Sequence, residues 1–386
     1  MKRIILKKMN KRRIKGGHPW IYKNEISNAE NVDPGEIVQV FNSSNQYIGK
    51  GYYNPYSLIS VRLLTRSNVE INESFFHNKI QKAYDFRKRF LKDSNSMRVV
   101  FGESDGLPGL VIDKFNNYLV VQFNTLGINC FKREVISSLI KIFSPDGIYE
   151  KSDSETLKKE HLEKNIEWLY KDGPELIKFN MNGINFLADT KGQKTGFFLD
   201  QRDNALNLSK YAKGKNLFDI FSYTGNFSFH MLKGGAKGCV LVDSSTRALE
   251  VAIEIYSLNH FSGKIEFVQD NAFNFLRNNS DEEIDCIVID PPAMTKSSYS
   301  RGKAIKGYKD LYISALKLLK KDSLFAASSC TQLIKEELWK ELIHEAFYDA
   351  KKEGKEIING GQPVDHPILS SVYETHYLKF KAFNID

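Results

Sequence analysis

Residues 216–225 have the sequence Asn-Leu-Phe-Asp-Ile-Phe-Ser-Tyr-Thr-Gly, an apolar run that leads into a polar turn. Short apolar runs then alternate with amphipathic segments, which is typical of βαβ units and a mostly parallel sheet. We therefore expect an α/β domain built on a mostly parallel sheet. Its predicted strands are residues 216–221, 239–242, 265–268, 284–289, 323–328 and 377–383, and its predicted helices are residues 225–233, 245–259, 271–279, 304–320 and 335–351.

Polar residues follow these predicted strands, at the edge where parallel α/β sheets bind ligands. The first turn contains a single glycine and consists of Phe221, Ser222, Tyr223, Thr224 and Gly225. Dinucleotide-binding turns contain three glycines so that the backbone can approach a pyrophosphate, so one glycine suits a nucleoside without phosphates. At the next strand ends, Asp243 can accept hydrogen bonds from ribose hydroxyls, and Asp270 and Asn271 can bind an adenine edge. This pattern predicts S-adenosylmethionine (SAM), although each acid could instead cap the following helix.

The fourth predicted strand is followed by Asp290-Pro291-Pro292, and the fifth is followed by Cys330. We expect Cys330 to lie beside Asp290, because the ends of neighbouring parallel strands meet at one edge of the sheet. A thiolate there could add to carbon 6 of a pyrimidine and make carbon 5 nucleophilic. Ala293 stands where methylases of exocyclic amines have an aromatic ring, which argues against amine methylation. The alternative is that Cys330 is a small buried apolar residue, the interpretation we apply to the remaining cysteines, Cys130, Cys239 and Cys286.

Basic residues are concentrated in two stretches. The chain has 55 Lys and Arg residues against 47 Asp and Glu residues, a net charge of +8, and residues 1–15 carry eight bases and no acid. Residues 296–309 combine bases with tyrosines, a combination suited to phosphate contact and base stacking. Both stretches could also be solvated surface. If they bind RNA, the candidate residues are Lys11, Arg12, Arg13, Lys296, Arg301 and Lys303.

The first half of the chain has a different organisation. Short strands at residues 36–41, 47–53 and 58–64 suggest a small β-barrel, a helical pattern covers residues 72–92, and strands return at residues 99–123 before a helix at 130–143. Residues 151–165 are charged and indicate a loop or an exposed helix. We predict domains at residues 1–73, 74–175 and 176–386.

Composition excludes several classes of protein. The chain is 41% hydrophobic and 26% charged, as expected of a globular protein. The four cysteines and eight histidines show no metal-binding spacing, so we expect no metal. No apolar run approaches the ~18 residues of a membrane span, and no signal peptide is evident. These features predict a cytoplasmic protein without a membrane partner.

A family resemblance rests on seven segments together, which are residues 17–22, 101–110, 194–202, 221–225, 290–292, 329–331 and 365–367. On these segments the chain resembles the bacterial 23S rRNA cytosine-C5 methyltransferases, which consist of an N-terminal PUA domain, a small α+β central domain and a Rossmann-like methyltransferase domain. Many RNA cytosine-C5 methylases have a second cysteine directly after the Asp-x-Pro turn, and this chain has Ala293 there, as in the single-cysteine branch.

The resemblance implies roles for individual residues. It implies that Cys330 is the nucleophile, that Gln201 joins the strand-end residues including Asp290 in contacting SAM, and that a PUA domain carrying His18 and Trp20 grips RNA. Residues 365–367 would form a site-closing loop. The implied function is SAM-dependent formation of 5-methylcytosine in 23S rRNA, either free or in an assembling large ribosomal subunit. The resemblance leaves open whether the protein forms a homodimer. Methylation of another atom, such as a guanine ring nitrogen, and a non-catalytic RNA-binding assembly factor are the alternatives.

Overall fold

A computed structural model of the chain describes residues 2–8, 12–29, 31–91, 94–279, 284–295 and 297–386. The chain divides into two compact units. The first comprises Met1–Phe179, Ala188–Phe197 and Val364–Thr375, and the second comprises Asn180–Leu187, Phe198–Pro363 and His376–Asp386. The late segment Val364–Thr375 therefore belongs to the first unit, although the sequence around it belongs to the second.

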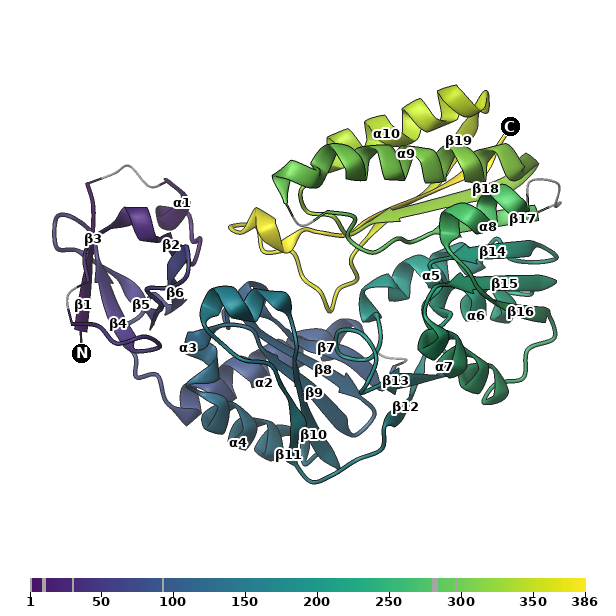
Figure 1. Cartoon of the computed structure of the whole chain (residues 1–386). Coiled ribbons are helices and arrows are strands. Elements are labelled where there is room, and N and C mark those ends of the chain that lie inside the picture. Colours follow the sequence, from purple (N-terminus) through teal and green to yellow (C-terminus); the bar gives the residue numbers. More distant parts are fainter. Residues whose placement is uncertain (1, 9–11, 30, 92–93, 280–283, 296) are drawn as a thin grey trace. The chain divides into compact units, whose positions relative to one another are not determined.

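A six-stranded sheet opens the first unit, with strand order β2-β6-β5-β4-β1-β3 (Figure 1). Alternate residues of β4 are buried, as expected of strands with one face on a core. A methyl group at Gly51 would lie 2.1 Å from the carbonyl oxygen of Arg62, so β5 and β6 can approach only with glycine there. The elements are β1 Lys2–Leu6, α1 Arg12–Lys15, β2 Trp20–Tyr22, β3 Ile26–Asn28, β4 Ile37–Phe41, β5 Tyr47–Tyr53 and β6 Ile59–Thr65.

A five-stranded sheet with order β11-β10-β9-β8-β7 forms the rest of the first unit. Helices α2 and α4 bury Phe76, Ile80 and Leu139 in one core with β7–β10. The Asn72 side chain caps α2 by accepting a hydrogen bond from the Phe75 amide at 3.1 Å. The elements are α2 Glu73–Phe90, β7 Ser96–Phe101, β8 Leu110–Phe115, β9 Tyr118–Phe123, α3 Leu126–Asn129, α4 Lys132–Phe143, β10 Gly147–Ser152 and β11 Asn165–Tyr170.

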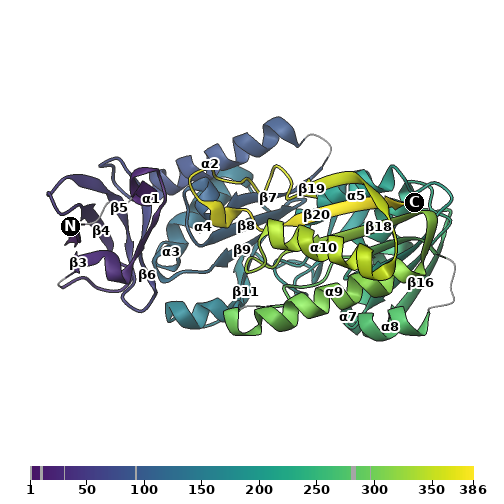
Figure 2. The same ribbon diagram turned by 90° about the horizontal axis from the view of Figure 1, so that it is seen from above.

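The second unit contains a seven-stranded sheet with order β16-β15-β14-β17-β18-β20-β19. Strands β14 to β18 are parallel, whereas β20 and β19 add antiparallel pairs. Helices α8, α9 and α10 cover one face, and α9 and α10 lie side by side (Figures 1 and 2). The elements are α5 Arg202–Ser209, β14 Asn216–Ile220, α6 Asn226–Lys233, β15 Gly238–Asp243, α7 Thr246–Ser257, β16 Lys264–Gln269, α8 Ala272–Asn278, β17 Ile284–Ile289, α9 Arg301–Leu318, β18 Leu319–Ser329, α10 Glu336–Ala350, β19 Gly354–Gly361 and β20 Lys379–Ile385.

Several elements were not predicted. One is the hairpin of β12 Leu176–Met181 and β13 Ile184–Asp189, which precedes the strands of the seven-stranded sheet in the sequence. The others are helix α5 and β19, the edge strand of that sheet. The sequence of β19 is rich in glycine and charged residues and lacks the apolar alternation of a central strand. Among the strands that the structure describes, β19 pairs with β20 alone, at the edge of the sheet. The segment expected as a loop or exposed helix at residues 151–165 contains the end of β10, a 3-10 turn and the first residue of β11.

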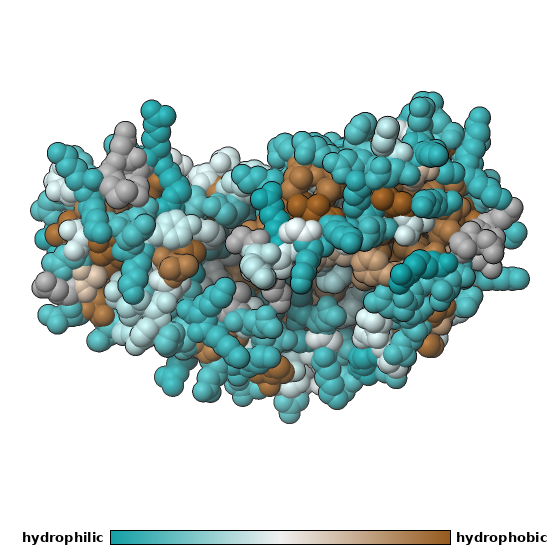
Figure 3. Space-filling view, turned by 45° about the horizontal axis from the view of Figure 1, so that its top comes forward, coloured by the Kyte–Doolittle hydropathy of each residue, from teal (hydrophilic) through white to brown (hydrophobic). Residues whose placement is uncertain are grey.

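Much of the surface is polar. On the face shown in Figure 3, hydrophilic residues predominate and the hydrophobic ones form separate patches. In the described part of the chain, no helix combines the length and the apolar character needed to cross a membrane.

Candidate functional site

The turn after β14 has an unusual backbone. Phe221 and Tyr223 adopt positive φ angles of 64° and 48°, and Gly225 has φ 84°. A Cβ atom at Gly225 would lie 2.7 Å from the Phe229 ring and 2.8 Å from Leu241, so this position requires glycine both for its dihedral and for its space. The turn is thus held against α6 and β15 in a conformation that a regular loop does not adopt.

Buried polar atoms gather in this turn without partners. Ser222 Oγ, Thr224 Oγ1 and both side-chain polar atoms of Asn226 are inaccessible to solvent and make no hydrogen bond to the residues that the structure describes. Buried polar groups without partners are rare because each costs about 1–3 kcal/mol. A polar ligand at the turn would satisfy them, so the residues present fit the amino-acid part of SAM.

The next two strand ends are also polar. Asp243 contacts the turn after β14, because its Oδ2 accepts a hydrogen bond from the Tyr223 amide at 2.9 Å. Its Oδ1 accepts a hydrogen bond from the Ser245 amide, also at 2.9 Å. The Asp270 amide donates to the Asp243 carbonyl at 3.3 Å. Asn271 caps α8 through the Phe273 amide at 3.0 Å. Asn271 therefore has the capping contact that was the alternative interpretation, while Asp243 shapes the turn.

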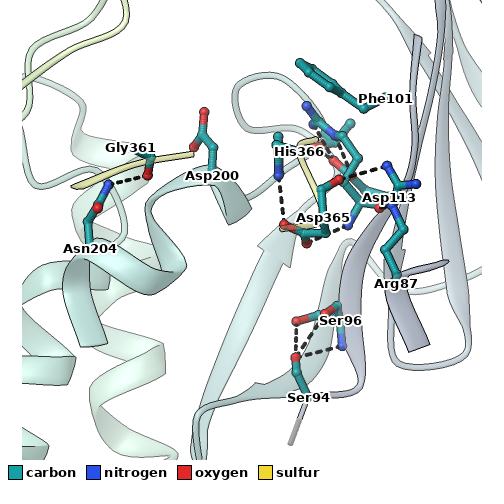
Figure 4. A network of polar contacts seen from close by, with 12 residues as sticks. Arg87, Ser94, Ser96, Phe101, Asp113, Asp200, Asn204, Gly361, Asp365 and His366 are labelled. Atoms are coloured by element: carbon teal, nitrogen blue, oxygen red, sulfur yellow. Dashed lines mark hydrogen bonds and ion pairs between the residues drawn. The ribbon is translucent and has the colours of Figure 1, made fainter. Parts of the chain in front are cut away.

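Gln201 connects two strand ends of the second unit. Its Nε2 donates to Asp290 Oδ1 at 2.9 Å, after β17, and to Ser328 Oγ at 2.8 Å, in β18. Asn204 Nδ2 in turn donates to Gln201 Oε1 at 2.6 Å and to the Gly361 carbonyl at 3.0 Å, the latter bond being drawn in Figure 4. With both amide ends bonded, the Gln201 side chain is fixed and orients the Asp290 carboxylate.

Cys330 lies beside the Asp290 turn. Its Sγ is 4.0 Å from the Pro291 carbonyl oxygen, and the side chain is partly exposed. Behind it, the Tyr308 hydroxyl is 2.8 Å from Thr331 Oγ1 and 3.1 Å from Ser329 Oγ. Burial raises the pKa of Tyr308 to about 12, with smaller contributions from Cys330 and Asp290. The structure thus brings together Asp290 and Cys330, at the ends of adjacent parallel strands.

Lys379 is a neighbour of this site that the sequence analysis did not find. It begins β20, pairs with Ser329 in register, and is only 6% exposed. Its ammonium donates to the carbonyls of Thr331 and Tyr377 at 3.2 Å each. Burial lowers the pKa of Lys379, while the negative charge of a Cys330 thiolate acts in the opposite direction. The sequence signal was weak, because Lys381 stands in the same strand and distinguishes neither lysine as a site residue.

The remaining cysteines differ from Cys330. Cys239 and Cys286 are buried in β15 and β17, and burial raises the pKa of both thiols. Cys130 is exposed and belongs to the first unit. A nucleophile needs an accessible thiolate, so the buried pair is unsuited to that role.

The predicted RNA-binding residues of the N-terminal segment have varied surroundings. Lys11 lies outside the described residues, and Arg12 is exposed. Arg13 binds Glu25 at 2.9 Å, and the Trp20 indole donates to Glu103 at 2.8 Å. His18 is 3% exposed, and burial lowers its pKa, so the neutral ring is favoured. These contacts favour structural roles for His18 and Trp20.

The second basic stretch is only partly described. Lys296 lies outside the described residues, while Arg301 and Lys303 are exposed in the first turn of α9. Within the described part of the chain, no three His, Cys, Asp or Glu residues are grouped so that they could hold a metal ion.

Asp219 provides a pH prediction for the second unit. It is 1% exposed in β14, and its Oδ2 accepts from the Ser228 amide at 3.1 Å and the Ser228 hydroxyl at 2.7 Å. Burial is the main reason that the pKa of Asp219 rises to about 7. Because the folded-state pKa lies above the unfolded value, this group's contribution is present below the unfolded pKa and is lost as pH rises through about 7.

We expect Asp219→Asn to melt at a higher temperature than wild type at pH 8, with the difference disappearing in acid. The gain is at most a few kcal/mol, since one pKa unit corresponds to about 1.4 kcal/mol. Thermal melting across a pH series measures it, with the exposed Glu250→Gln as control. Parallel melting profiles for wild type and Asp219→Asn would contradict the expectation.

Comparison with known proteins adds to this geometry. Residues 4–66 match the family of PUA-like domains, and residues 152–330 match the S-adenosylmethionine-dependent methyltransferase family. The chain is 33% identical over 384 residues to Ribosomal RNA large subunit methyltransferase I of Alteromonas mediterranea, covering 97% of both chains. It is 34% identical over 386 residues to the protein of that name from Escherichia coli, covering 98% of both.

The chain belongs to the ribosomal RNA large subunit methyltransferase I family. This assignment confirms the predicted PUA-like and Rossmann-like parts and identifies SAM as the cofactor. Among solved structures, a Streptococcus mutans protein assigned as a SAM-dependent methyltransferase is similar over 100% of both chains, with a TM-score of 0.85 and 22% identity. A methyltransferase solved in complex with SAH matches equally well, at TM-score 0.85. Both similarities confirm the fold.

Proposed function

We propose that this family member forms 5-methylcytosine in 23S rRNA through a covalent adduct between Cys330 and the target cytosine. The observation that carries the proposal is the position of Cys330, a partly exposed thiol 4.0 Å from the Asp290-Pro291 turn at the ligand-binding edge of the sheet. The names of the relatives support rRNA of the large subunit as the substrate.

The chemistry explains why a cysteine is needed. Carbon 5 of cytosine is a weak nucleophile, but addition of the Cys330 thiolate to carbon 6 places electron density on carbon 5. When bound, SAM supplies an electrophilic methyl group. Loss of the proton from carbon 5 then expels the thiolate, which breaks the sulfur–carbon bond, restores the aromatic ring and regenerates Cys330. The residue that accepts this proton is not assigned.

Two neighbours support the role of Cys330. Asp290, fixed by Gln201 at 2.9 Å, would hold the base at ring nitrogen 3 and its amine. The buried ammonium of Lys379 beside the thiol would favour the thiolate, which is the nucleophilic form. The target nucleotide must leave its stack to reach these groups.

The cofactor would occupy the polar strand ends. The unpartnered atoms of Ser222 and Thr224 are suited to the amino-acid part. Asp243 retains lone pairs for the ribose hydroxyls after its two backbone contacts. The other proposed contacts are Phe221, Tyr223, Gly225, Asp270, Asn271, Asp290 and Gln201.

The remaining predictions are part of the same proposal. RNA contact would come from a PUA-like domain at residues 1–73 and from the basic residues near Arg301. A central domain at residues 74–175 would separate it from the methyltransferase domain at residues 176–386. We place the protein in the cytoplasm, with rRNA or an assembling large subunit as its partner.

The experiment uses 23S rRNA transcribed with 5-fluorocytidine in place of cytidine. Because fluorine on carbon 5 cannot leave as a proton does, the adduct should persist, and wild type with SAM should migrate with RNA on a denaturing gel. In parallel, nucleoside mass spectrometry of methylated ordinary rRNA should detect 5-methylcytidine. Methylguanosine without an adduct would contradict the proposal and favour the guanine alternative. Failure to bind SAM in calorimetry would favour the assembly factor.

A further inference from the structure

The first compact unit contains a cavity of about 470 Å³. Its walls come from the end of β6, helix α2, the 3-10 turn Gly102–Asp105 and the segment Val364–Thr375, all within that unit. Pockets of roughly 300–1,000 Å³ are typical of small-ligand sites, so this cavity can hold one nucleotide. The residues of the proposed active site belong to the second unit and do not line this cavity, and the PUA-like match at residues 4–66 covers only part of its wall.

Three cations line the cavity, namely Arg66, Lys79 and Lys82. None of them forms an ion pair with a carboxylate among the described residues; Arg66 Nη2 donates instead to the carbonyls of Ile14 and His18, at 2.7 and 3.3 Å. The Lys79 ammonium lies against Gly106, where an added Cβ atom would be 2.7 Å from its Nζ. Burial, followed by the charge of Lys82, lowers the pKa of Lys79, while the charge of Asp105 acts in the opposite direction. An anion in the cavity would act in the same direction as Asp105 and stabilise the charged ammonium.

The two acids in the cavity wall are already engaged. Asp105 accepts from Arg87 Nη1 and Nη2 at 2.5 and 2.8 Å, and Glu103 accepts from the Trp20 indole at 2.8 Å. The charge of Asp105 is therefore compensated by Arg87, whereas Glu103 keeps its charge and has its hydrogen bond from a neutral indole. The positive charges of the cavity are therefore only partly compensated.

Two further features suit a base rather than a bare anion. Ser104 Oγ is buried and makes no hydrogen bond to the residues that the structure describes. The Phe86 ring also lines the cavity and is half-buried. Single-stranded RNA is held in proteins by cations at its phosphates and aromatic rings at its bases.

We propose that this cavity binds one nucleotide of a single-stranded segment of the RNA substrate, with Lys79 and Lys82 at the phosphate and Phe86 and Ser104 at the base. The inference rests on the proposed rRNA substrate but not on the reaction at Cys330. It provides a second point of attachment, formed by α2 and the PUA-like sheet together, that would hold the RNA while another nucleotide reacts.

The test measures binding of a fluorescein-labelled single-stranded RNA to the full chain by fluorescence anisotropy over a range of salt concentrations. We expect Lys79→Gln and Lys82→Gln each to weaken binding about 5- to 10-fold. Each should also reduce the slope of log affinity against log salt by about 0.7, the value for one phosphate contact on a single strand. Lys88→Gln is the matched control, because Lys88 is exposed on the same helix and does not line the cavity.

Other outcomes would overturn the inference. Equal losses for Lys82→Gln and Lys88→Gln would show that only the general charge of the helix matters. Unchanged binding in both cavity variants would exclude the cavity. Inorganic phosphate that displaces the RNA at constant ionic strength, and binds wild type as tightly as the RNA, would assign the cavity to free phosphate. If the cavity variants behave as expected while no cytosine adduct forms, the cavity stands and the proposed reaction fails alone.

Discussion

Replacement of Cys330 by alanine is expected to lower kcat for rRNA methylation at least ~10³-fold, the scale of loss when a covalent nucleophile is removed. The physical reason is that neither of the other two thiols of the second unit can reach the ring, because Cys239 and Cys286 are buried within β15 and β17. Without addition at carbon 6, carbon 5 of cytosine stays too weak a nucleophile to take a methyl group. SAM affinity should be unchanged, since the cofactor contacts that we propose lie on other strand ends.

The measurement compares initial rates of methyl incorporation into 23S rRNA for wild type, Cys330→Ala and Cys330→Ser, with SAM binding followed by calorimetry. Cys130→Ala is the control, because Cys130 is an exposed cysteine of the first unit. It should retain wild-type turnover. Full activity in Cys330→Ala would give Cys330 a structural role and return the question to methylation of another atom.

A Lys379 variant tests how the surroundings of the Cys330 thiol affect catalysis while the thiol itself is kept. Lys379→Met removes the ammonium that donates to the Thr331 and Tyr377 carbonyls and keeps a side chain of similar length. The rRNA methylation rate of this variant should be below that of wild type at neutral pH. It should approach the wild-type rate as pH rises, because more Cys330 thiolate then forms without the Lys379 ammonium. Cys330→Ala has no thiol to ionise and should not recover.

The sequence predicted the strands and helices of the second half well because their apolar periodicity is strong. The five polar strand ends follow β14 to β18, which are parallel, and the Cys330–Asp290 neighbourhood follows from the adjacency of β17 and β18. Lys379 could not be predicted, since its approach to Thr331 depends on an antiparallel strand added from the end of the chain. The edge strand β19 was missed for a similar reason: pairing with β20, rather than local pattern, makes it a strand.

The position of the segment around Asp365 was the part of the structure that the sequence predicted least well. Its motif resembles the catalytic domain, yet Val364–Thr375 belongs to the first compact unit. Asp365 and His366 are 0% and 1% exposed there, with Asp365 Oδ2 accepting from the Arg98 amide at 3.0 Å. Figure 4 shows His366, Asp365 and Arg87 in one polar network. Such a return of the chain to an earlier sheet leaves no periodic signal.

Arg87→Met is expected to destabilise the protein by about 3–5 kcal/mol, the cost of breaking a buried ion pair on one side. Arg87 is fully buried in α2, and its guanidinium makes two hydrogen bonds to Asp105, at 2.5 and 2.8 Å. It also donates to the carbonyls of Arg98 and Asp365, at 2.8 and 3.0 Å. Methionine fills a similar volume but leaves the Asp105 charge and both carbonyls without these donors.

Urea denaturation of the full chain measures this loss, and hydrogen exchange locates it. Exchange should rise first in Val364–Thr375, because Arg87 is one of the groups that attach this segment to the first unit. The control is Arg89→Met on the same helix, where the side chain is exposed and the change should stay within about 0.5 kcal/mol. A loss of similar size in both variants would mean that helix propensity, and not the buried network, sets the cost.

The double variant Arg87→Met/Asp105→Leu decides between two physical origins of the effect. If the cost comes from an uncompensated carboxylate, removal of both partners should be less damaging than removal of Arg87 alone, because no charge is left buried. If it comes from the donors lost by the Arg98 and Asp365 carbonyls, the double variant should be at least as unstable as the single one. Since Asp105 has a bidentate contact and each carbonyl only one bond, we expect the first result, with partial recovery of stability. Exchange in Val364–Thr375 should stay elevated in the double variant, because its carbonyl contact to Arg87 is still missing.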